Sequence, residues 1–459
     1  MVAKRQRTAQ AREASDTYRG GQEGTGLPSP HPAMHVARLP TRASARIGVF
    51  PPHTTIRVTA SRDIPDVSSQ TPGYDLAQWR SRIPLLAHTI PMNNCSQAPQ
   101  TDATRAAADA YLESWGRDGM DWDTWVAEVE RARQSFARLI NADVDEVAVT
   151  SSVSQAASAF ASALSFDGAR RRVLASAAEF PTVGHVWLAQ HSRGAEVHWA
   201  PLSNDGTIDT GEYDARIDER TRVVSACHAY YLNGFKHDIG AIARIARARG
   251  ALTFVDAYQT LGTEPIDVKA LGIDALAGGT LKYLMAIAGI AFLYVRRDLA
   301  EEMRPTVTGW FGRVNPFAFD ATALDWAPGA RRFDSGTPPI INAYIARAGL
   351  EIIHEVGPAR VAAWTRVLSE RLMSGGAARG LVLHGTSSAS AKAPTTAFWV
   401  GRDSATVERR MRARGIIPSA RGEVIRLSPH FYSTLDDVDR ALDTLAAVLH
   451  DPSDPPRRA

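Results

Sequence analysis

Residues 252–295 read LTFVDAYQTLGTEPIDVKALGIDALAGGTLKYLMAIAGIAFLYV. We expect an apolar strand that ends in Asp256, a second strand from Asp274 to Ala277 that opens into GGTLKYL, and a third from Gly289 to Val295. Short apolar runs between polar turns are typical of strands buried in a parallel sheet. An acid therefore ends one strand, and Lys282 follows the end of the next.

The same alternation of strands and helices continues on the N-terminal side. Strands are expected at 147–150, 172–176, 196–200 and 222–228, each followed by a helical pattern. This alternation predicts an α/β fold with a mostly parallel sheet flanked by helices. Ligands of such sheets bind beyond the carboxyl ends of the strands, where Asp256 and Lys282 fall.

Later in the chain the pattern changes to shorter strands and fewer helices. From about residue 380, strands alternate with a helix, and a final helix is expected over 435–449. The sequence thus predicts a large domain over 74–335 and a smaller α+β C-terminal domain over 336–459, which includes a connecting helix. Residues 74–120 are expected to pack near the smaller domain.

Residues 1–73 differ from the rest, because they are rich in Arg, Ser, Thr, Pro and Gly and poor in acids. This composition predicts a disordered N-terminal extension. A start codon placed too early and a transit peptide are alternative interpretations.

The composition is that of an ordinary soluble globular protein, with 459 residues, 44% of them hydrophobic, 22% charged, and a net charge of +3. No aromatic–basic repeat, zinc-finger spacing or long basic helix points to nucleic acid, and no metal site is expected. The longest apolar run, 284–295, is shorter than the roughly 20 residues that cross a bilayer. Two cysteines fit a reducing compartment, so we expect a cytoplasmic protein.

Asp256 and Lys282 together indicate a cofactor. A carboxylate can hold a pyridine nitrogen protonated, and a lysine can form a Schiff base with an aldehyde; pyridoxal phosphate (PLP) carries both groups. Gln259, in DAYQ, can donate to the phenolic oxygen of this cofactor. The glycines of GGTLKY are expected to let the cofactor approach the backbone. Taken singly, a solvated lysine and a helix-capping aspartate are the ordinary interpretations.

Other segments offer the remaining groups that such a site needs. In TSSVSQAASAF, residues 150–160, Ser154 can cap a helix and donate to phosphate beside the N–H of Val153, although an ordinary N-cap fits equally well. Phe180 in EFPT can stack on a ring or pack in the core. Arg426, inside the apolar strand VIRLS, can hold a substrate carboxylate or form a structural ion pair.

His228 closes the expected strand 222–228 and could lie near the cofactor, but a single histidine at a strand end is more often structural. Four further side chains are candidates for the substrate pocket. The four candidates are Asn94, Trp310, Arg313 and Arg332.

At this point the residues resemble a known family. The segment from Asp256 to Leu284, followed by GIAFLYV, resembles the class V aminotransferase family of fold-type I PLP-dependent enzymes. This group includes transaminases, kynureninases, cysteine desulfurases and isopenicillin N epimerase-like proteins. TSSVSQA, RRFDSGTPP and IRLSPHFYST extend the resemblance over about residues 90–450, and EFPT and GWFGR look like kynureninase segments.

The resemblance implies a role for each matching position, and a homodimer with shared active sites. Lys282 matches the catalytic lysine and Asp256 the pyridinium partner. Thr337 is expected to reach the partner's cofactor. The other implied residues are Val153, Ser154 and Thr280 at the phosphate, Phe180 on the ring, Gln259 at the phenolic oxygen, and Arg426 with Trp310 and Asn94 at the substrate.

Positions at which this sequence differs from the family's subgroups reduce the number of reactions that fit. The stretch ARGIIPSARGEVIRLS lacks the cysteine that desulfurases carry before this strand, and Cys95 and Cys227 lie elsewhere in the sequence. Gln259 and Leu281 replace a histidine and a tyrosine of kynureninases. We therefore expect an aminotransferase acting on an amino acid. The alternatives are a kynureninase-like hydrolase or β-lyase, an epimerase, and a non-catalytic PLP-binding protein, which the absence of a DNA-binding module disfavours.

Overall fold

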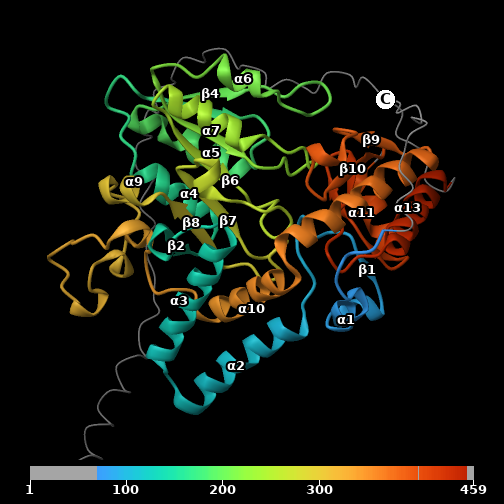
Figure 1. Ribbon diagram of the computed structural model, residues 1–459, viewed down its shortest axis with the longest axis horizontal. Helices are drawn as coiled ribbons and strands as arrows, with labels where there is room; N and C mark the ends of the chain where they lie inside the picture. Colours follow the sequence, from blue (N-terminus) through green and yellow to red (C-terminus); the bar gives the residue numbers. More distant parts are fainter. Residues whose placement is uncertain (1–69, 402, 452–459) are drawn as a thin grey trace, which may run out of the picture. The chain divides into compact units, whose positions relative to one another are not determined.

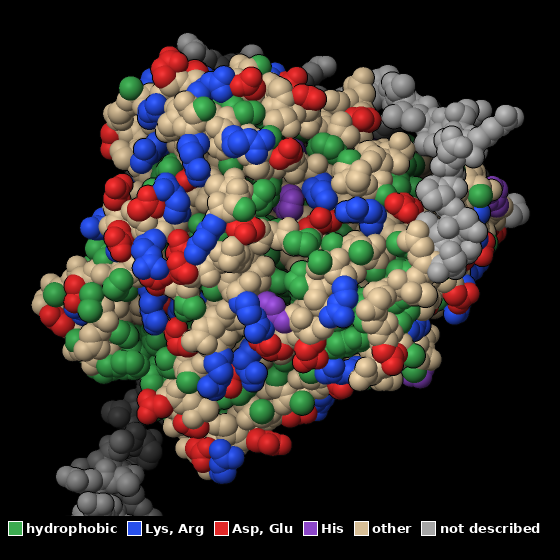
Figure 2. All heavy atoms as spheres, viewed as in Figure 1, with side chains coloured by type: hydrophobic (Ala, Val, Ile, Leu, Met, Phe, Trp, Pro, Cys, Tyr) green, Lys and Arg blue, Asp and Glu red, His purple; other side chains and the backbone are tan. Residues whose placement is uncertain are grey.

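The computed structural model describes residues 70–401 and 403–451 (Figure 1). The expectation of a disordered extension over 1–73 therefore falls, up to residue 69, outside the described residues. Within the described part, no helix is both long and apolar enough to span a membrane. Basic and acidic side chains are interspersed over the face shown in Figure 2, in keeping with the small net charge.

A seven-stranded sheet forms the centre of the large N-terminal part, and its strand order is β2-β8-β7-β6-β5-β3-β4. All neighbouring strands are parallel except β8, which runs antiparallel to both β2 and β7. The strands are β2 (Val147–Thr150), β3 (Arg172–Ser176), β4 (Glu196–Ala200), β5 (Thr221–Cys227), β6 (Leu252–Asp256), β7 (Ala275–Gly279) and β8 (Ala291–Val295). The prediction of a mostly parallel sheet is confirmed.

Helices cover both faces of this sheet because its strands are apolar on both faces. On one face Phe136 of α3 stacks on Phe292 of β8, with ring centroids 4.4 Å apart. On the other face Phe160 of α4 lies 5.4 Å from Phe254 of β6. The helices in this part of the chain, some of which pack on other helices, are α2 (Asp102–Asp118), α3 (Trp122–Leu139), α4 (Val153–Ser162), α5 (Pro181–Ala189), α6 (Thr210–Asp214), α7 (Ile239–Ala248), α8 (Val268–Leu271), α9 (Arg297–Glu302) and α10 (Ile340–Val356).

A second, four-stranded antiparallel sheet lies in the C-terminal part, in the order β12-β13-β10-β9. Its strands are β9 (Val382–His384), β10 (Thr396–Trp399), β12 (Ser419–Arg421) and β13 (Val424–Leu427). Helices α11 (Pro358–Ala378), α12 (Ser404–Arg412) and α13 (Leu435–His450) pack on it around a separate apolar cluster. The boundary proposed between residues 335 and 336 stays a prediction.

The segment before α2 joins this C-terminal part. After α1 (Leu76–Ser81), strand β1 (Ile90–Pro91) pairs in parallel with β11 (Ile416–Ile417), and Asn93 forms a bridge with Ser428. These pairings hold the loop that follows β1 next to β13.

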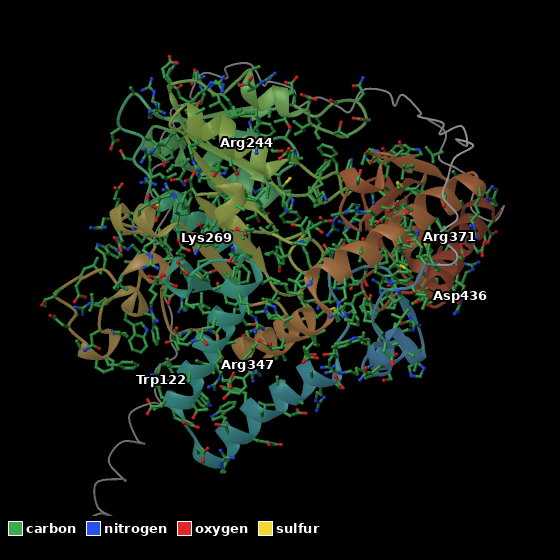
Figure 3. All side chains as sticks on the ribbon, viewed as in Figure 1. Trp122, Arg244, Lys269, Arg347, Arg371 and Asp436 are labelled. Atoms are coloured by element: carbon green, nitrogen blue, oxygen red, sulfur yellow. The ribbon has the colours of Figure 1, made fainter. Side chains whose placement is uncertain are left out.

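A buried ion pair ties α3 to the large sheet. Arg133 is 1% exposed; its Nη2 lies 2.7 Å from Asp334 Oδ2, and its Nη1 donates to the Val147 carbonyl at 2.6 Å. The Val149 N–H donates to the other oxygen of Asp334 at 2.8 Å. Arg347 of α10, labelled in Figure 3, pairs with the buried Glu128 of α3 at 2.7 Å and is itself more exposed than Arg133.

We expect Asp334→Ala to lower the free energy of unfolding by about 1.5–3 kcal/mol, because it removes the more buried of the two carboxylates that pair with Arg133 and leaves the Val149 N–H without its acceptor. Asp109→Ala, which removes the exposed i,i+4 pair with Arg105, is the control and should change the free energy of unfolding far less, because water screens that pair. Urea unfolding followed by circular dichroism compares the two variants. Equal shifts of the two midpoints would contradict this assignment.

Candidate active site

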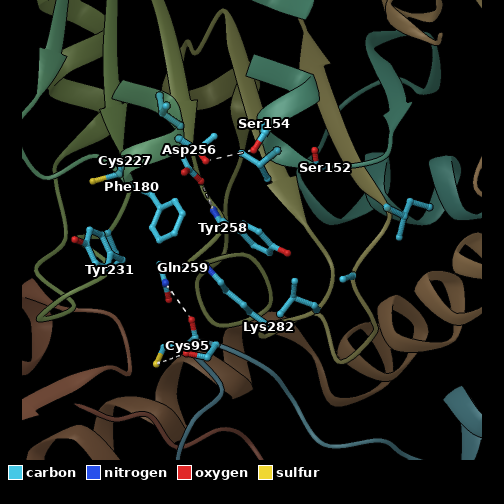
Figure 4. Close-up of a pocket in the computed structure, with 18 of the residues that line it drawn as sticks. Cys95, Ser152, Ser154, Phe180, Cys227, Tyr231, Asp256, Tyr258, Gln259 and Lys282 are labelled. Atoms are coloured by element: carbon cyan, nitrogen blue, oxygen red, sulfur yellow. Dashed lines mark hydrogen bonds between the residues drawn. The ribbon is translucent and has the colours of Figure 1, made fainter. Parts of the chain in front are cut away.

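A cavity of about 340 Å³, called here the main cavity, lies at the carboxyl ends of β5, β6 and β7 (Figure 4). Its wall combines loops of the large sheet with residues 95–96 and with Arg421 and Arg426 of the small sheet. Ligands of parallel sheets bind at this edge. The structure therefore brings segments from across the chain to one place.

Asp256 is the last residue of β6 and lines the main cavity. Its carboxylate is 7% exposed, and its Oδ1 accepts a hydrogen bond from the Tyr258 N–H at 2.9 Å. Burial raises the pKa of Asp256, while the Tyr258 N–H and the charge of Lys282 oppose this rise. Among the described residues no ion pair within 4.0 Å occupies this carboxylate, so it can face a cationic group of a ligand.

Lys282 follows β7 and reaches the main cavity from the neighbouring strand. Its Nζ lies 4.0 Å from the centre of the Tyr258 ring and 5.7 Å from that of Phe180. Burial lowers the pKa of Lys282 to about 8, although Asp256 partly opposes this shift and Arg426 adds to it. An amine with this pKa is partly neutral near neutral pH, which both bonding to an aldehyde and proton transfer require.

The glycines before Lys282 leave space for neighbouring side chains. A Cβ at Gly279 would lie 2.3 Å from the Tyr258 ring, and a Cβ at Gly278 would lie 1.9 Å from Leu261. The expectation that these glycines let the cofactor approach the backbone stays a prediction. They leave room for the side chains of Tyr258 and Leu261, which pack against the end of β7.

The N-terminus of α4 lies at the other end of the main cavity. Ser152 caps the helix, with its Oγ accepting from the Gln155 N–H at 3.1 Å, so the expectation that Ser154 is the cap is wrong. The Ser154 hydroxyl instead lies 3.4 Å from that of Thr182. The N–H groups of Val153 and Ser154, in the first turn, have no intrahelical acceptor. Together these donors suit a phosphate.

Phe180 and Gln259 also line the main cavity. Phe180 is 40% exposed and meets Tyr231 edge to face at 5.2 Å, so one ring face stays open to a ligand. The Gln259 amide donates to the Cys95 carbonyl at 3.2 Å, while its own buried oxygen has no hydrogen-bond partner among the described residues. An unpaired buried polar atom beside a cavity is typical of a ligand contact.

Arg426 is a buried cation without an acidic partner in the part of the chain that the structure describes. It is 1% exposed; its Nη1 donates to the Tyr231 carbonyl at 2.7 Å, and its Nη2 donates to the hydroxyls of Ser96 and Ser419. Its Nε has no hydrogen-bond partner within the described ranges. The structural ion pair considered as an alternative is therefore absent from the described residues. Because an unpaired buried charge is costly, this guanidinium is suited to a bound carboxylate.

The structure adds residues that the sequence reasoning missed. Tyr231, Tyr258, Thr182 and Arg421 line the main cavity, and so do the two cysteines. Burial alone would raise the pKa of the Cys95 thiol, but Arg426, two serine hydroxyls and Lys282 outweigh it and lower that pKa. The position of Tyr258, two residues after Asp256, was a usable signal. The placement of Cys95 depends on the distant pairing of β1 with β11.

Two expected site residues have their polar groups engaged elsewhere. The Thr280 hydroxyl donates to the Ile287 carbonyl at 2.8 Å and does not line the main cavity, contrary to its expected role at the phosphate. Asn94 is fully buried; it donates to the Ser428 carbonyl and accepts from the Tyr432 hydroxyl, both at 2.8 Å. Asn94 therefore holds the loop after β1 rather than facing the pocket.

Other candidates lie outside the main cavity of this chain. Trp310 stacks on Trp122 with ring centroids 6.1 Å apart, and Thr337 lines a separate cavity of about 220 Å³. Arg313 pairs with Asp325 at 2.7 Å, and Arg332 donates to backbone carbonyls. The role of Thr337 at a partner's site stays a prediction.

His228 is a structural residue. Its Nδ1 lies 2.8 Å from the Thr260 hydroxyl, and burial lowers its pKa to about 3, so the ring is neutral.

The chemistry of these groups fits PLP. A carboxylate, a lysine of lowered pKa, an open aromatic ring and the donors at the N-terminus of α4 all line one cavity. They match the pyridine nitrogen, the aldehyde, the ring face and the phosphate of that cofactor. The oxygen of Gln259 and the Nε of Arg426, which have no hydrogen-bond partner among the described residues, are free to contact such a ligand.

Comparisons with known proteins agree with this fit. The model of the family "Aminotransferase class-V" matches residues 122–440. An uncharacterized aminotransferase of Bacillus subtilis is 36% identical, covering 81% of this chain and 97% of that protein. A kynureninase of Burkholderia mallei is 30% identical over 60% of this chain and 68% of that protein.

A solved structure shows the same fold. The cysteine desulfurase of Thermococcus onnurineus superposes with a TM-score of 0.74 at 21% identity, covering 81% of this chain and 98% of that one. Because the family model covers well over half of the sequence, the chain belongs to the class V aminotransferase family of PLP-dependent enzymes.

Proposed function

We propose that this enzyme is an aminotransferase, which moves the amino group of an amino acid to a 2-oxo acid. The observation that carries this proposal is Arg426, a buried guanidinium without an acidic partner in the described chain, in the same cavity as Asp256 and Lys282. An amino acid brings the carboxylate that this cation lacks. The Bacillus subtilis relative, described as an aminotransferase, supports the same function.

Each of these side chains has a task in the proposed reaction. When bound, PLP supplies an electron sink that makes the Cα–H bond of the substrate acidic. Arg426 binds the substrate carboxylate and fixes its orientation. Asp256 keeps the proton on the pyridine nitrogen, and Lys282, in its neutral form, removes the proton from Cα.

The contacts around Lys282 suit a group that moves a proton. The ring of Tyr258 lies 4.0 Å from its Nζ and shields it from water on one side. The lowered pKa places the amine near the pH at which it can both accept and release a proton. The atom to which Lys282 returns that proton decides whether the outcome is transamination or epimerisation.

A second candidate is a kynureninase-like hydrolase or β-lyase, supported by the kynureninase of Burkholderia mallei among the relatives. Such a reaction would use the same acid, lysine and arginine.

We further propose that the enzyme is a cytoplasmic homodimer, in which Thr337 approaches the partner's cofactor. The two reduced, buried cysteines support the compartment.

The requirement for a 2-oxo acid acceptor distinguishes an aminotransferase from a kynureninase-like hydrolase or β-lyase. With an amino acid alone, we expect one equivalent of 2-oxo acid per active site, because the amino group stays on the enzyme. Repeated turnover should then begin only when a second 2-oxo acid is added. Mass spectrometry of the products measures both stages. Continuous release of pyruvate or alanine without an acceptor would instead indicate a lyase or hydrolase.

Replacing Arg426 tests the observation that carries the proposal. Arg426→Lys keeps a charge but loses the planar fork, so we expect the affinity for the amino acid to fall about tenfold to a hundredfold. The visible absorption of bound PLP should remain, because Arg426 is assigned to the substrate and not to the cofactor. Spectroscopic titration with an amino acid gives the dissociation constant. Arg409→Gln, at an exposed arginine of α12, is the control.

The lowered pKa of Lys282 predicts how cofactor uptake depends on pH. Only the neutral amine bonds to the aldehyde, so below a pKa of about 8 the uptake rate should rise about tenfold per pH unit and then level off. Stopped-flow absorption after PLP is added to the apoprotein measures this rate, and Lys282→Ala should show no visible band. A rate still rising tenfold between about pH 9 and 10 would indicate an ordinary lysine.

A further inference from the structure

A second arginine lines the main cavity beside Arg426. Arg421 is the last residue of β12, and its side chain is exposed. In the β12–β13 pairing Ser419 lies opposite Arg426 and accepts a hydrogen bond from it. Residues two apart in a strand share a face, so Arg421 projects on the same face as Ser419, towards the substrate.

Arg421 has no acidic partner among the residues that the structure describes. Within the described part of the chain, its guanidinium makes one long hydrogen bond, from Nη1 to the Ala420 carbonyl at 3.4 Å. The nearby carboxylate of Glu408 is engaged otherwise, because it pairs with Arg412 at 2.9 Å and accepts from the Ala420 N–H at 2.9 Å. The guanidinium of Arg421 therefore lines the main cavity, and no described carboxylate pairs with it.

The main cavity holds one more arginine than a substrate with one carboxylate uses. Its charged lining residues are Asp256, Lys282, Arg421 and Arg426. The fit to PLP uses Asp256 and Lys282, and the phosphate end is lined by hydroxyls and N–H groups. Two arginines remain on the C-terminal strands, and the α-carboxylate of an amino acid needs only one of them.

We propose that Arg421 binds a second carboxylate, so that the substrate is an acidic amino acid or a dicarboxylic 2-oxo acid. This inference rests on the proposed aminotransferase function and names the substrate class of the same site. Arg426 holds the α-carboxylate in the buried part of the cavity, and Arg421 holds the side-chain carboxylate near its mouth. A guanidinium fork suits a carboxylate that arrives from solvent, and charge complementarity favours it over an apolar side chain.

The test compares ligands that differ by one carboxylate. Succinate and propionate carry no amino group, so their binding to the PLP-loaded enzyme can be measured at equilibrium by calorimetry. Arg421→Gln should weaken succinate binding about tenfold or more and leave propionate within about twofold. Arg421→Lys should retain part of the difference, and Arg409→Gln should change neither ligand. The rate of the first half-reaction should fall in parallel for aspartate and glutamate but not for alanine.

Three outcomes would overturn the inference. Arg421→Gln could leave succinate binding unchanged, or weaken both ligands equally, in which case the side chain does not read the second carboxylate. The variant could also lose PLP while its affinities for succinate and propionate stay unchanged, which would assign Arg421 to the cofactor's phosphate.

The aminotransferase proposal fails separately. Acidic and neutral amino acids could yield no 2-oxo acid while the affinity for succinate still depends on Arg421. The aminotransferase assignment would then be wrong, and the dicarboxylate site would be supported. If neutral amino acids transaminate and Arg421→Gln changes nothing, only the dicarboxylate inference is wrong.

Discussion

The structure depends on holding opposite charges in one cavity without letting them pair. Asp256, Lys282 and Arg426 all line the main cavity, yet the described residues show no ion pair within 4.0 Å among them. Neutral groups stabilise each charge only in part. The Tyr258 N–H contacts Asp256, the Tyr258 ring contacts Lys282, and carbonyl and hydroxyl oxygens contact Arg426. Because a direct ion pair would satisfy these groups internally, their separation keeps them available to a ligand.

The sheet produces this separation. Asp256 pairs with Ala277 on β7, where β6 ends, while β7 continues to Gly279 before the chain returns with Lys282. Tyr258 fills the space above Gly279 and lies between the backbone of β7 and the lysine amine. Arg426 comes from another sheet, whose strand β13 is joined to the loop after β1 by the bridge of Asn93 with Ser428. The acid, the amine and the guanidinium are thus fixed by different parts of the backbone.

These origins explain how far the sequence could predict the site. Asp256 and Lys282 end or follow apolar strands that are neighbours in a parallel sheet, so local pattern alone placed them together. Phe180 and the loop before α4 follow the same rule. Cys95, Tyr231 and Arg421 do not, because their positions depend on loop conformations and on pairings between distant segments, which periodicity cannot reveal. Thr280 and Asn94 had suitable chemistry, but neighbouring backbone carbonyls took their hydrogen bonds.

Different parts of the main cavity therefore serve the cofactor and the substrate. One wall, formed at the ends of β6 and β7 and at α4, holds the acid, the lysine and the neutral donors that suit PLP. Several reactions can use that wall unchanged, because the same acid and amine serve any chemistry that begins with loss of the Cα proton. Discrimination between substrates then depends on the remaining wall, to which Cys95, Tyr231, Arg421 and Arg426 come from segments outside β6 and β7. The excess of cationic groups on that wall makes charge, more than shape, its dominant selective property.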